Sequence, residues 1–331
     1  MSFARVHLTW GLLGVLVLVT PPFVTASDYY LQFLTQVMIF AVLFTALDIA
    51  VGHAGLVSAA HGALFGLGAY TTGVLGTKLH WGFWTTLPAA VCVGVLCGLL
   101  VGALTLKLDG HYFVIATLCF GIVVTIVVRN GGTLTNGDLG LSPIPYPSNL
   151  GPLDFSTPKG FYLLTAALAV LASTGAYLLM RTATGQRLRA MRDNAPLASA
   201  LGVDVSMVRL VAFLVSAGMA AVAGSFQAAN LAFISPSITD FDVAVTAVLA
   251  VIVGGRSSVA GPYVGAVIFV VLPEVLRSAD DYRLIIMGSL LIATIIFAPD
   301  GVVGRVKAMV GLLVSRFRTS SVIAKSRGEA A

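Results

Sequence analysis

The chain has 331 residues, of which 58% are hydrophobic and 10% are charged, with a formal net charge of +5. Its mean hydropathy is +0.97. Soluble domains are roughly 45–50% apolar and about 25% charged, so the composition excludes a soluble globular protein, a disordered chain and a small disulfide framework. No basic patch interleaved with aromatic residues indicates nucleic-acid binding. We therefore predict an all-α, polytopic integral membrane protein without an attached soluble catalytic domain.

Uncharged stretches divide the chain into about ten transmembrane segments, since roughly 20 apolar residues cross the hydrocarbon core. Asp48 is the only charge between residues 29 and 77, a region long enough for two helices with a turn near residues 51–55. The last three stretches are short, so we expect broken or re-entrant helices among them. The stretches are residues 6–27, 29–47, 49–77, 82–106, 110–128, 160–180, 210–239, 243–255, 257–273 and 284–299.

The distribution of Lys and Arg predicts the orientation. With ten crossings and both termini inside, the inside segments hold 14 of the 19 basic residues, as the positive-inside rule requires. An alternative is that the first stretch is a signal peptide, with an apolar region at residues 8–19 and small residues before a cleavage site. In both cases the next helix begins outside.

Three segments break the apolar pattern around one transmembrane domain, residues 1–304. Residues 130–160 form a loop rich in Gly and Pro, which we place outside. Residues 181–209 are polar and basic, and we place them inside. Residues 305–331 are a basic tail that we expect in the cytoplasm, where it can contact membrane lipid.

The inner segment 181–209 reads as two short capped helices. Leu188 and Met191 form an apolar stripe among arginines, and Asn194 can cap a second helix that begins near residue 195. Gly202 suits the position after that helix, and Asp204 or Ser206 can cap the next one. Because a simple tether would not need capped helices, we interpret this segment as a docking surface for a cytoplasmic partner. The alternative is a solvated, positively charged loop.

Glycines recur at intervals of four, which places them on one helix face where backbones approach closely. The seven residues that we assign to helix packing are Gly62, Gly66, Gly94, Gly98, Gly102, Gly261 and Gly265. A Gly-Ser-Gly-Gly pattern with spacings of three, four and four occurs twice. We interpret it as an internal repeat of the kind found in transporters; the alternative is a chance match in a Gly-rich chain. The copies are Gly55, Ser58, Gly62 and Gly66, and Gly254, Ser257, Gly261 and Gly265.

We find no candidate catalytic residues in the sequence. The phosphate-binding motif G-x-x-x-x-G-K-[ST] is absent, so the chain does not bind ATP in that way. The three cysteines lie in apolar stretches without a metal-ligand pattern, so we assign no metal and no cofactor. Asp48 is either a functional intramembrane acid or a helix-capping residue near the inner surface.

Four sequence blocks resemble the membrane-spanning permease subunit of branched-chain amino acid ABC importers. They are GHAGLVSAAHGALFGLGAY at residues 52–70, LTNGDLGLSPIP at 134–145, the segment at 184–204, and the segment at 253–266 with the following LPE at 272–274. Asp48 and His53 depart from the usual Asn and Tyr. Relatives that import urea or another small polar solute therefore remain alternatives, as does an ion-coupled secondary transporter that uses Asp48.

The resemblance implies a multi-pass subunit of a bacterial-type inner membrane, paired with a second homologous permease, separate ATP-binding subunits and an external solute-binding protein. It implies that the inner segment couples to the ATPase. We place the translocation pathway beside Asp48, Ser58, His61 and Ser257. The expected ATPase-coupling residues are Arg187, Leu188, Arg189, Met191, Arg192, Asp193, Asn194, Leu201 and Gly202.

Overall fold

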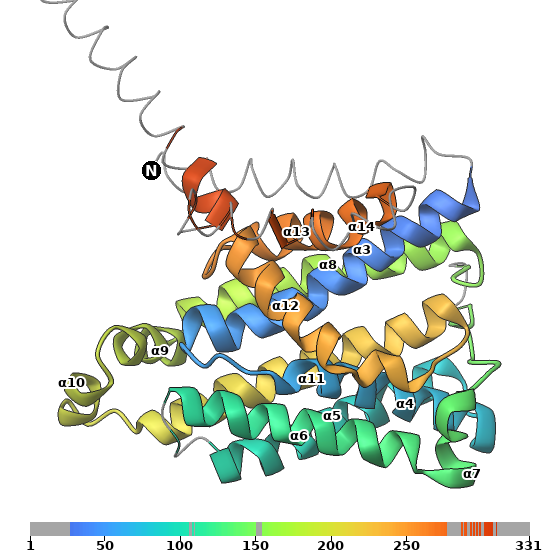
Figure 1. Ribbon diagram of the computed structural model, residues 1–331, viewed down its shortest axis with the longest axis horizontal. Helices are drawn as coiled ribbons and strands as arrows, with labels where there is room; N and C mark the ends of the chain where they lie inside the picture. Colours follow the sequence, from blue (N-terminus) through green and yellow to red (C-terminus); the bar gives the residue numbers. More distant parts are fainter. Residues whose placement is uncertain are drawn as a thin grey trace, which may run out of the picture.

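A computed structural model describes residues 27–105, 108, 110–149, 154–276, 301–306 and 309, with single residues between 286 and 298. Across these residues the fold is helical, as predicted, and the only β-contact is an isolated bridge between Leu141 and Ile234 (Figure 1). The helices are α3 (Asp28–Asp48), α4 (Ala60–Leu79), α5 (Phe83–Thr105), α6 (His111–Arg129), α7 (Gly132–Thr135), α8 (Pro158–Arg181), α9 (Ala183–Asp193), α10 (Ala195–Ala200), α11 (Val205–Leu231), α12 (Phe241–Gly254), α13 (Gly261–Ala266) and α14 (Leu272–Val275).

Five segments of the described chain are long and apolar enough to cross a membrane: Asp28–His53, Phe83–Thr105, His111–Arg129, Pro158–Arg181 and Val205–Leu231. Two of the three predicted short segments correspond to α12 and to the run from α13 to α14, which a π-helical turn, η4 (Val267–Val271), interrupts. The first predicted stretch, apart from Ser27, and most of 284–299 lie outside the described residues. The count of ten crossings and the location of both termini thus remain predictions.

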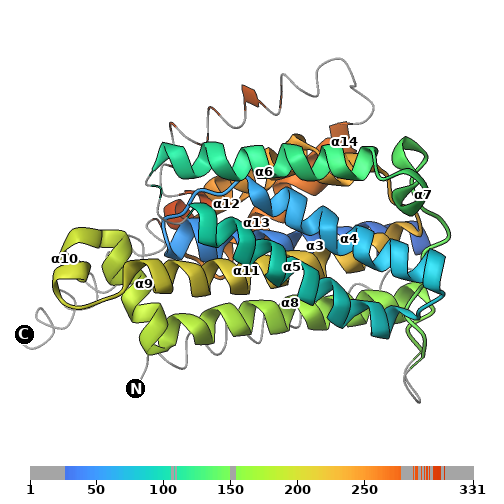
Figure 2. The same ribbon diagram turned by 90° about the horizontal axis from the view of Figure 1, so that it is seen from below.

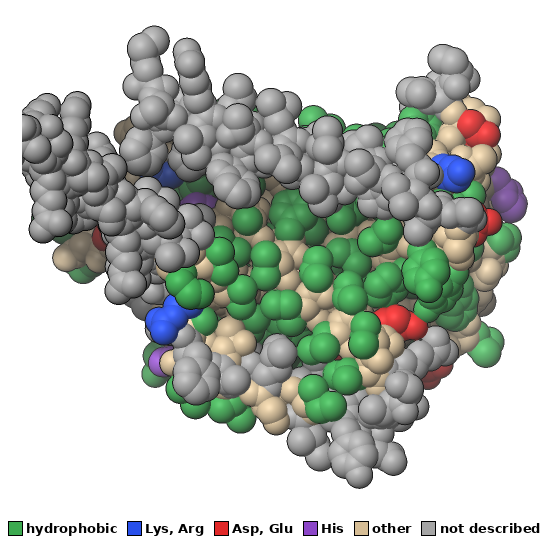
Figure 3. Space-filling model, turned by 90° about the horizontal axis from the view of Figure 1, so that it is seen from above, with side chains coloured by type: hydrophobic (Ala, Val, Ile, Leu, Met, Phe, Trp, Pro, Cys, Tyr) green, Lys and Arg blue, Asp and Glu red, His purple; other side chains and the backbone are tan. Residues whose placement is uncertain are grey.

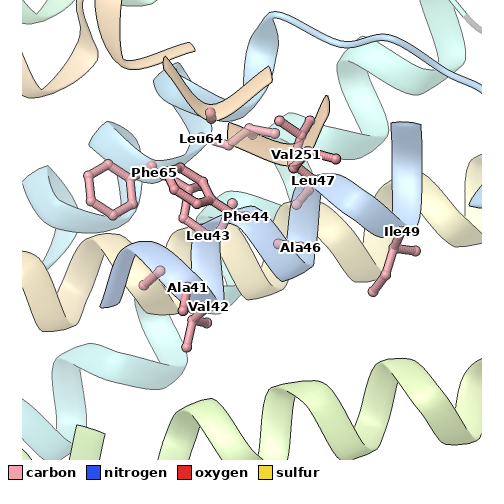
Figure 4. Packing of buried hydrophobic residues seen from close by; sticks show 14 of the residues in the cluster. Ala41, Val42, Leu43, Phe44, Ala46, Leu47, Ile49, Leu64, Phe65 and Val251 are labelled. Atoms are coloured by element: carbon pink, nitrogen blue, oxygen red, sulfur yellow. The ribbon is translucent and has the colours of Figure 1, made fainter. Parts of the chain in front are cut away.

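Helices α3 and α11 form the centre of the bundle. Among the described spans, Asp28–His53 comes first in the chain, and we call it the first span. Its most apolar part is 83% buried, whereas that of α6 is only 22% buried. Helix α11 packs against α3, α4 and α5, and α3 packs against α8. Phe44 and Leu47 of α3 point into a core that Phe65 of α4 and Val251 of α12 complete (Figure 4). The first span is therefore enclosed by protein, and α6 lies at the periphery.

Small residues let α4 and α11 cross with their backbones in contact. A Cβ added at Gly68 would meet the carbonyl oxygen of Ala221, and one added at Gly224 would meet that of Phe65. At the same crossing, Ser225 Oγ donates to the carbonyl oxygen of Gly68 over 3.3 Å. Close backbone approach of this kind stabilises helix pairs in lipid, where no hydrophobic force drives association.

The predicted inner and outer segments lie at opposite ends of the bundle, with α9 and α10 at one end and α7 at the other (Figures 1 and 2). The predicted caps of the inner segment are confirmed. Asn194 Oδ1 accepts the N–H of Leu197 at the start of α10, and Asp204 Oδ1 accepts that of Met207 in α11, each over 3.0 Å. Gly202 has the positive φ (84°) of a residue that ends a helix.

Apolar side chains cover the middle of one face of the molecule, and charged side chains lie mainly toward its two ends (Figure 3). Exposed apolar residues also follow α5 and α6, including Leu104 and Val127 with 70% and 63% of their surface exposed. Such continuous apolar surface fits contact with lipid or with another membrane subunit.

Candidate functional site

Three segments distant in sequence meet beside α9. Arg192, near the C-terminal end of α9, donates through Nη1 to the carbonyl oxygen of Gly52 and to Ser257 Oγ, each over 2.5 Å. Ser257 Oγ in turn donates to the same Gly52 oxygen over 2.6 Å. We call Asp48, Gly52, Arg192 and Ser257 the Arg192 junction. It joins the end of the first span, the loop after α12 and the inner segment.

Asp48 completes the junction from the C-terminal end of α3. Its side chain is nearly inaccessible, and its Oδ1 accepts the backbone N–H of Ser257 over 2.8 Å. Its Oδ2 lies 3.7 Å from Nε2 of His53, which closes the π-helical turn η1 (Ile49–His53). A buried carboxylate is stabilised by such a hydrogen bond and by a nearby cation, which here is the Arg192 guanidinium. Asp48 therefore lies at a helix end, as the capping interpretation expects, and its hydrogen-bond donor is the distant Ser257.

Gly52 is the residue that lets the three segments approach. A Cβ at this position would overlap the Asp48 carboxylate and crowd the backbone nitrogen of Ser257. Ser257 itself has a φ of 59°, a left-handed conformation unusual for a residue with a Cβ. Its two hydrogen bonds to Asp48 and Gly52 hold it there.

The inner segment divides into a buried and an exposed face. Leu188 and Met191 are buried against the bundle. The tip of α10 exposes two large apolar side chains, Leu197 at 57% and Leu201 at 78%. Of the residues predicted to couple to the ATPase, these are exposed: Arg187, Arg189, Arg192, Asp193, Asn194, Leu201 and Gly202.

The structure brings together two of the four predicted pathway residues, Asp48 and Ser257. Ser58 and His61 lie apart from them. Ser58 is fully buried before α4, where its Oγ accepts the backbone N–H of Ala60. His61 Nε2 lies 3.0 Å from Ser216 Oγ of α11, and its ring meets Phe213 edge-on. His61 therefore faces the core.

A crevice of about 240 Å³ runs along α6 from Leu118 to Arg129, between α4 and α12. Half of its lining residues are small or hydroxylated, and most of the others are large and apolar. The small or hydroxylated ones are Ala59, Ala63, Gly121, Thr125, Thr239 and Ala244. An ion pair stands at its far end, with Arg129 Nη2 3.1 Å from Asp240 Oδ1. The axial rise of α6 from Leu118 to Arg129 is roughly 16 Å, about half of the hydrocarbon thickness.

At six of the seven predicted packing glycines, an added Cβ would meet another segment of the chain. A Cβ on Gly62 would meet Ala244 of α12, and one on Gly94 or Gly98 would meet Ala217 of α11. A Cβ on Gly66 would meet Thr239. One on Gly261 would meet the backbone of Gly255, and one on Gly265 that of Ala250; Gly102 is buried.

Sequence reasoning missed Gly52, Gly68 and Gly224. Gly52 opens the first matched block, which was the available signal for it.

No cluster of three His, Cys, Asp or Glu side chains suited to a metal ion occurs among the described residues. The site therefore consists of a hydrogen-bonded junction, an exposed apolar tip and a crevice within a bundle of membrane-spanning helices. It lies on helices that are long and apolar enough to cross a membrane.

Comparison with known proteins defines the family. Residues 29–295 match the family described as branched-chain amino acid transport system / permease component, and the chain belongs to this family. It is similar to the high-affinity branched-chain amino acid transport system permease protein LivM of Salmonella typhimurium strain LT2, with 32% identity over 81% of this chain and 68% of that protein. LivM of Escherichia coli K12 is 31% identical over the same shares.

A second group of relatives carries another name. The autoinducer 2 import system permease protein LsrC of Salmonella paratyphi B is 29% identical over 79% of this chain and 74% of that protein. No solved structure matches the chain.

Proposed function

We propose that the chain is the permease subunit of an ATP-driven importer for branched-chain amino acids in a bacterial inner membrane. Family membership carries the proposal, together with a similarity to LivM that exceeds the similarity to LsrC. The subunit works with a second homologous permease, separate ATP-binding subunits and an external solute-binding protein. The missing phosphate-binding motif fits this division of labour.

The exposed tip of α10 is the proposed ATPase-docking surface. Leu197 and Leu201 expose apolar surface at one end of the bundle. We assign this end to the cytoplasm because the inner segment is rich in basic residues. Arg187 and Arg189 flank it on α9. Apolar anchors within a charged rim are the usual composition of a protein interface.

The proposed pathway follows the crevice between α4, α6 and α12, with the second permease closing its open side. The small residues in its lining suit a branched aliphatic side chain. The Thr125 hydroxyl, which donates to the Thr239 carbonyl oxygen over 2.9 Å, can still accept a hydrogen bond from a passing solute. Ser58 and His61 do not line this crevice; they support it from the start of α4, where Ser58 Oγ accepts the Ala60 N–H and His61 bonds Ser216 of α11.

An ion-coupled transporter that uses Asp48 is the rival function. The contacts of Asp48 argue against it, because Oδ1 is occupied by the Ser257 N–H and Oδ2 lies near His53. Such an acid serves as a structural acceptor more readily than as a site for a passing ion.

Affinity purification from gently solubilised membranes tests the proposed assembly. With a tag on this chain, we expect mass spectrometry to recover ATP-binding subunits and a second permease in stable proportion. Recovery of the chain alone, repeated after crosslinking in intact cells, would contradict the proposal. ATP-independent uptake driven by an ion gradient would then favour the rival.

A further inference from the structure

We propose that Arg192 transmits the movement of the ATPase to the membrane-spanning region, as a positioning residue rather than as an ATPase-docking residue. The inference rests on the proposed function and deepens it. It departs from the expectation that Arg192 forms part of the docking surface together with the other arginines of α9.

The first argument concerns where the Arg192 guanidinium is used. Nη1 binds two acceptors within the permease, the Gly52 carbonyl oxygen and Ser257 Oγ. Hydrogen bonds from a charged donor are among the stronger ones in proteins. A guanidinium held in this way would have to break two such bonds before it could bind an ATPase subunit through the same nitrogen.

The second argument concerns what Arg192 connects. Gly52 follows Asp48 at the end of the most buried span, and Ser257 lies between α12 and α13. Ser257 belongs to the second copy of the internal Gly-Ser pattern, and Gly52 lies three residues before the first copy. Through one side chain, α9 therefore contacts the helix end just before the first copy and the loop within the second copy.

The third argument is mechanical continuity. Leu197 is exposed on α10, and Leu201 is exposed just after its last residue. Helix α10 packs directly on α9. Leu188 and Met191 fix α9 to the bundle on one side. A displacement of α10 by the ATPase would thus reach Arg192 and then the loops at Gly52 and Ser257. Since α12 lines the crevice, that displacement reaches the proposed pathway.

The test uses the complete importer in proteoliposomes, with uptake and ATP hydrolysis measured on the same preparation. For Arg192→Ala we expect normal assembly and retained ATP hydrolysis, but about tenfold less solute transported per ATP, because two charge-assisted bonds are lost. Gln186→Ala is the matched control, as Gln186 is an exposed neighbour on α9 outside the proposed contacts. It should leave both rates unchanged.

A double-variant cycle separates transmission from a general loss of structure. Ser257→Ala removes one acceptor but keeps the backbone N–H that binds Asp48, so we expect a partial loss of coupling. If Arg192 acts through Ser257, the double variant should couple no worse than Arg192→Ala alone. Additive losses would overturn the proposal. Should Arg192→Ala fail to fold, Ser257→Ala and Arg192→Lys still report the coupling ratio.

The remaining outcomes separate the two proposals. Loss of ATPase subunits from an otherwise folded Arg192→Ala complex would make Arg192 a docking residue and overturn this inference, while leaving the proposed function intact. An unmodified complex that hydrolyses no ATP during uptake would instead overturn the proposed function.

Discussion

Arg192 donates a 2.5 Å hydrogen bond to the main-chain carbonyl oxygen of Gly52, 140 residues earlier in the chain. This contact fixes the inner segment to the end of the most enclosed span. It depends on a glycine at position 52, since the space beside its Cα is filled by Asp48 and Ser257.

Gly52→Ala should therefore destabilise the protein and impair uptake. Its Cβ would push apart Asp48 and the backbone of Ser257, and overpacking in a filled site typically costs about 1–3 kcal/mol. Thermal unfolding in detergent measures this loss. Gly175→Ala is the control, because a Cβ there meets nothing within 4 Å. Equal melting temperatures for Gly52→Ala and the unmodified protein would show that the junction is loosely packed.

Filling the crevice should block transport without disturbing the fold. A Cβ at Gly121 makes only an ordinary 3.7 Å contact with the Ala59 carbonyl oxygen, so the backbone accepts a side chain. For Gly121→Leu, whose side chain would occupy the crevice, we expect uptake to fall at least about tenfold while assembly is retained. Gly121→Ala, which adds the Cβ alone, should transport nearly normally. Normal uptake by Gly121→Leu would place the pathway elsewhere.

Charging the tip of α10 should release the ATPase. Leu197→Glu combined with Leu201→Glu puts two carboxylates where apolar anchors are proposed, and loss of such anchors commonly costs more than about 2 kcal/mol of binding. Co-purification of the ATP-binding subunits is the measurement. Leu139→Glu makes the same chemical change at a residue that is 85% exposed and lies near α7 at the opposite end. It should retain the partners; undiminished recovery with the α10 variant would refute the docking surface.

His61→Ala should lower stability more than it lowers uptake per folded molecule. The His61 ring is buried against Phe213 and bonds Ser216, so its removal leaves a cavity of the kind that typically costs about 2–5 kcal/mol. Thermal unfolding and uptake normalised to folded protein are compared with those of Ser216→Ala, which removes the bond to His61 and the Ser216 bond to the Phe213 carbonyl oxygen but keeps the His61 ring. An unchanged melting temperature with abolished uptake would instead make His61 part of the pathway itself.

The sequence was most informative where local chemistry determines structure. The caps at Asn194 and Asp204 and the left-handed Gly202 follow from side-chain type and position, and each lies where it was predicted. The division of residues 29–77 into two helices was also predicted, but the turn expected near residues 51–55 lies slightly later, because a π-helical turn extends the first helix to His53 before α4 begins at Ala60.

Contacts between distant segments could not be predicted in the same way. Nothing local to Arg192 distinguishes it from Arg187 or Arg189, yet only Arg192 reaches Gly52 and Ser257. Likewise, four-residue spacing identified glycines within one helix, whereas Gly68 and Gly224 act as a pair across two helices. Such pairs depend on how helices cross, which a single sequence does not state.

ATP-driven uptake of radiolabelled leucine by the purified assembly in proteoliposomes tests the central claim most directly. The vesicles contain ATP or a non-hydrolysable analogue, and the solute-binding protein is added outside. We expect uptake that requires hydrolysable ATP, persists when ion gradients are collapsed, and is competed by isoleucine and valine. Uptake that follows an ion gradient and ignores ATP, or ATP-driven uptake of another solute with none of leucine, would contradict it.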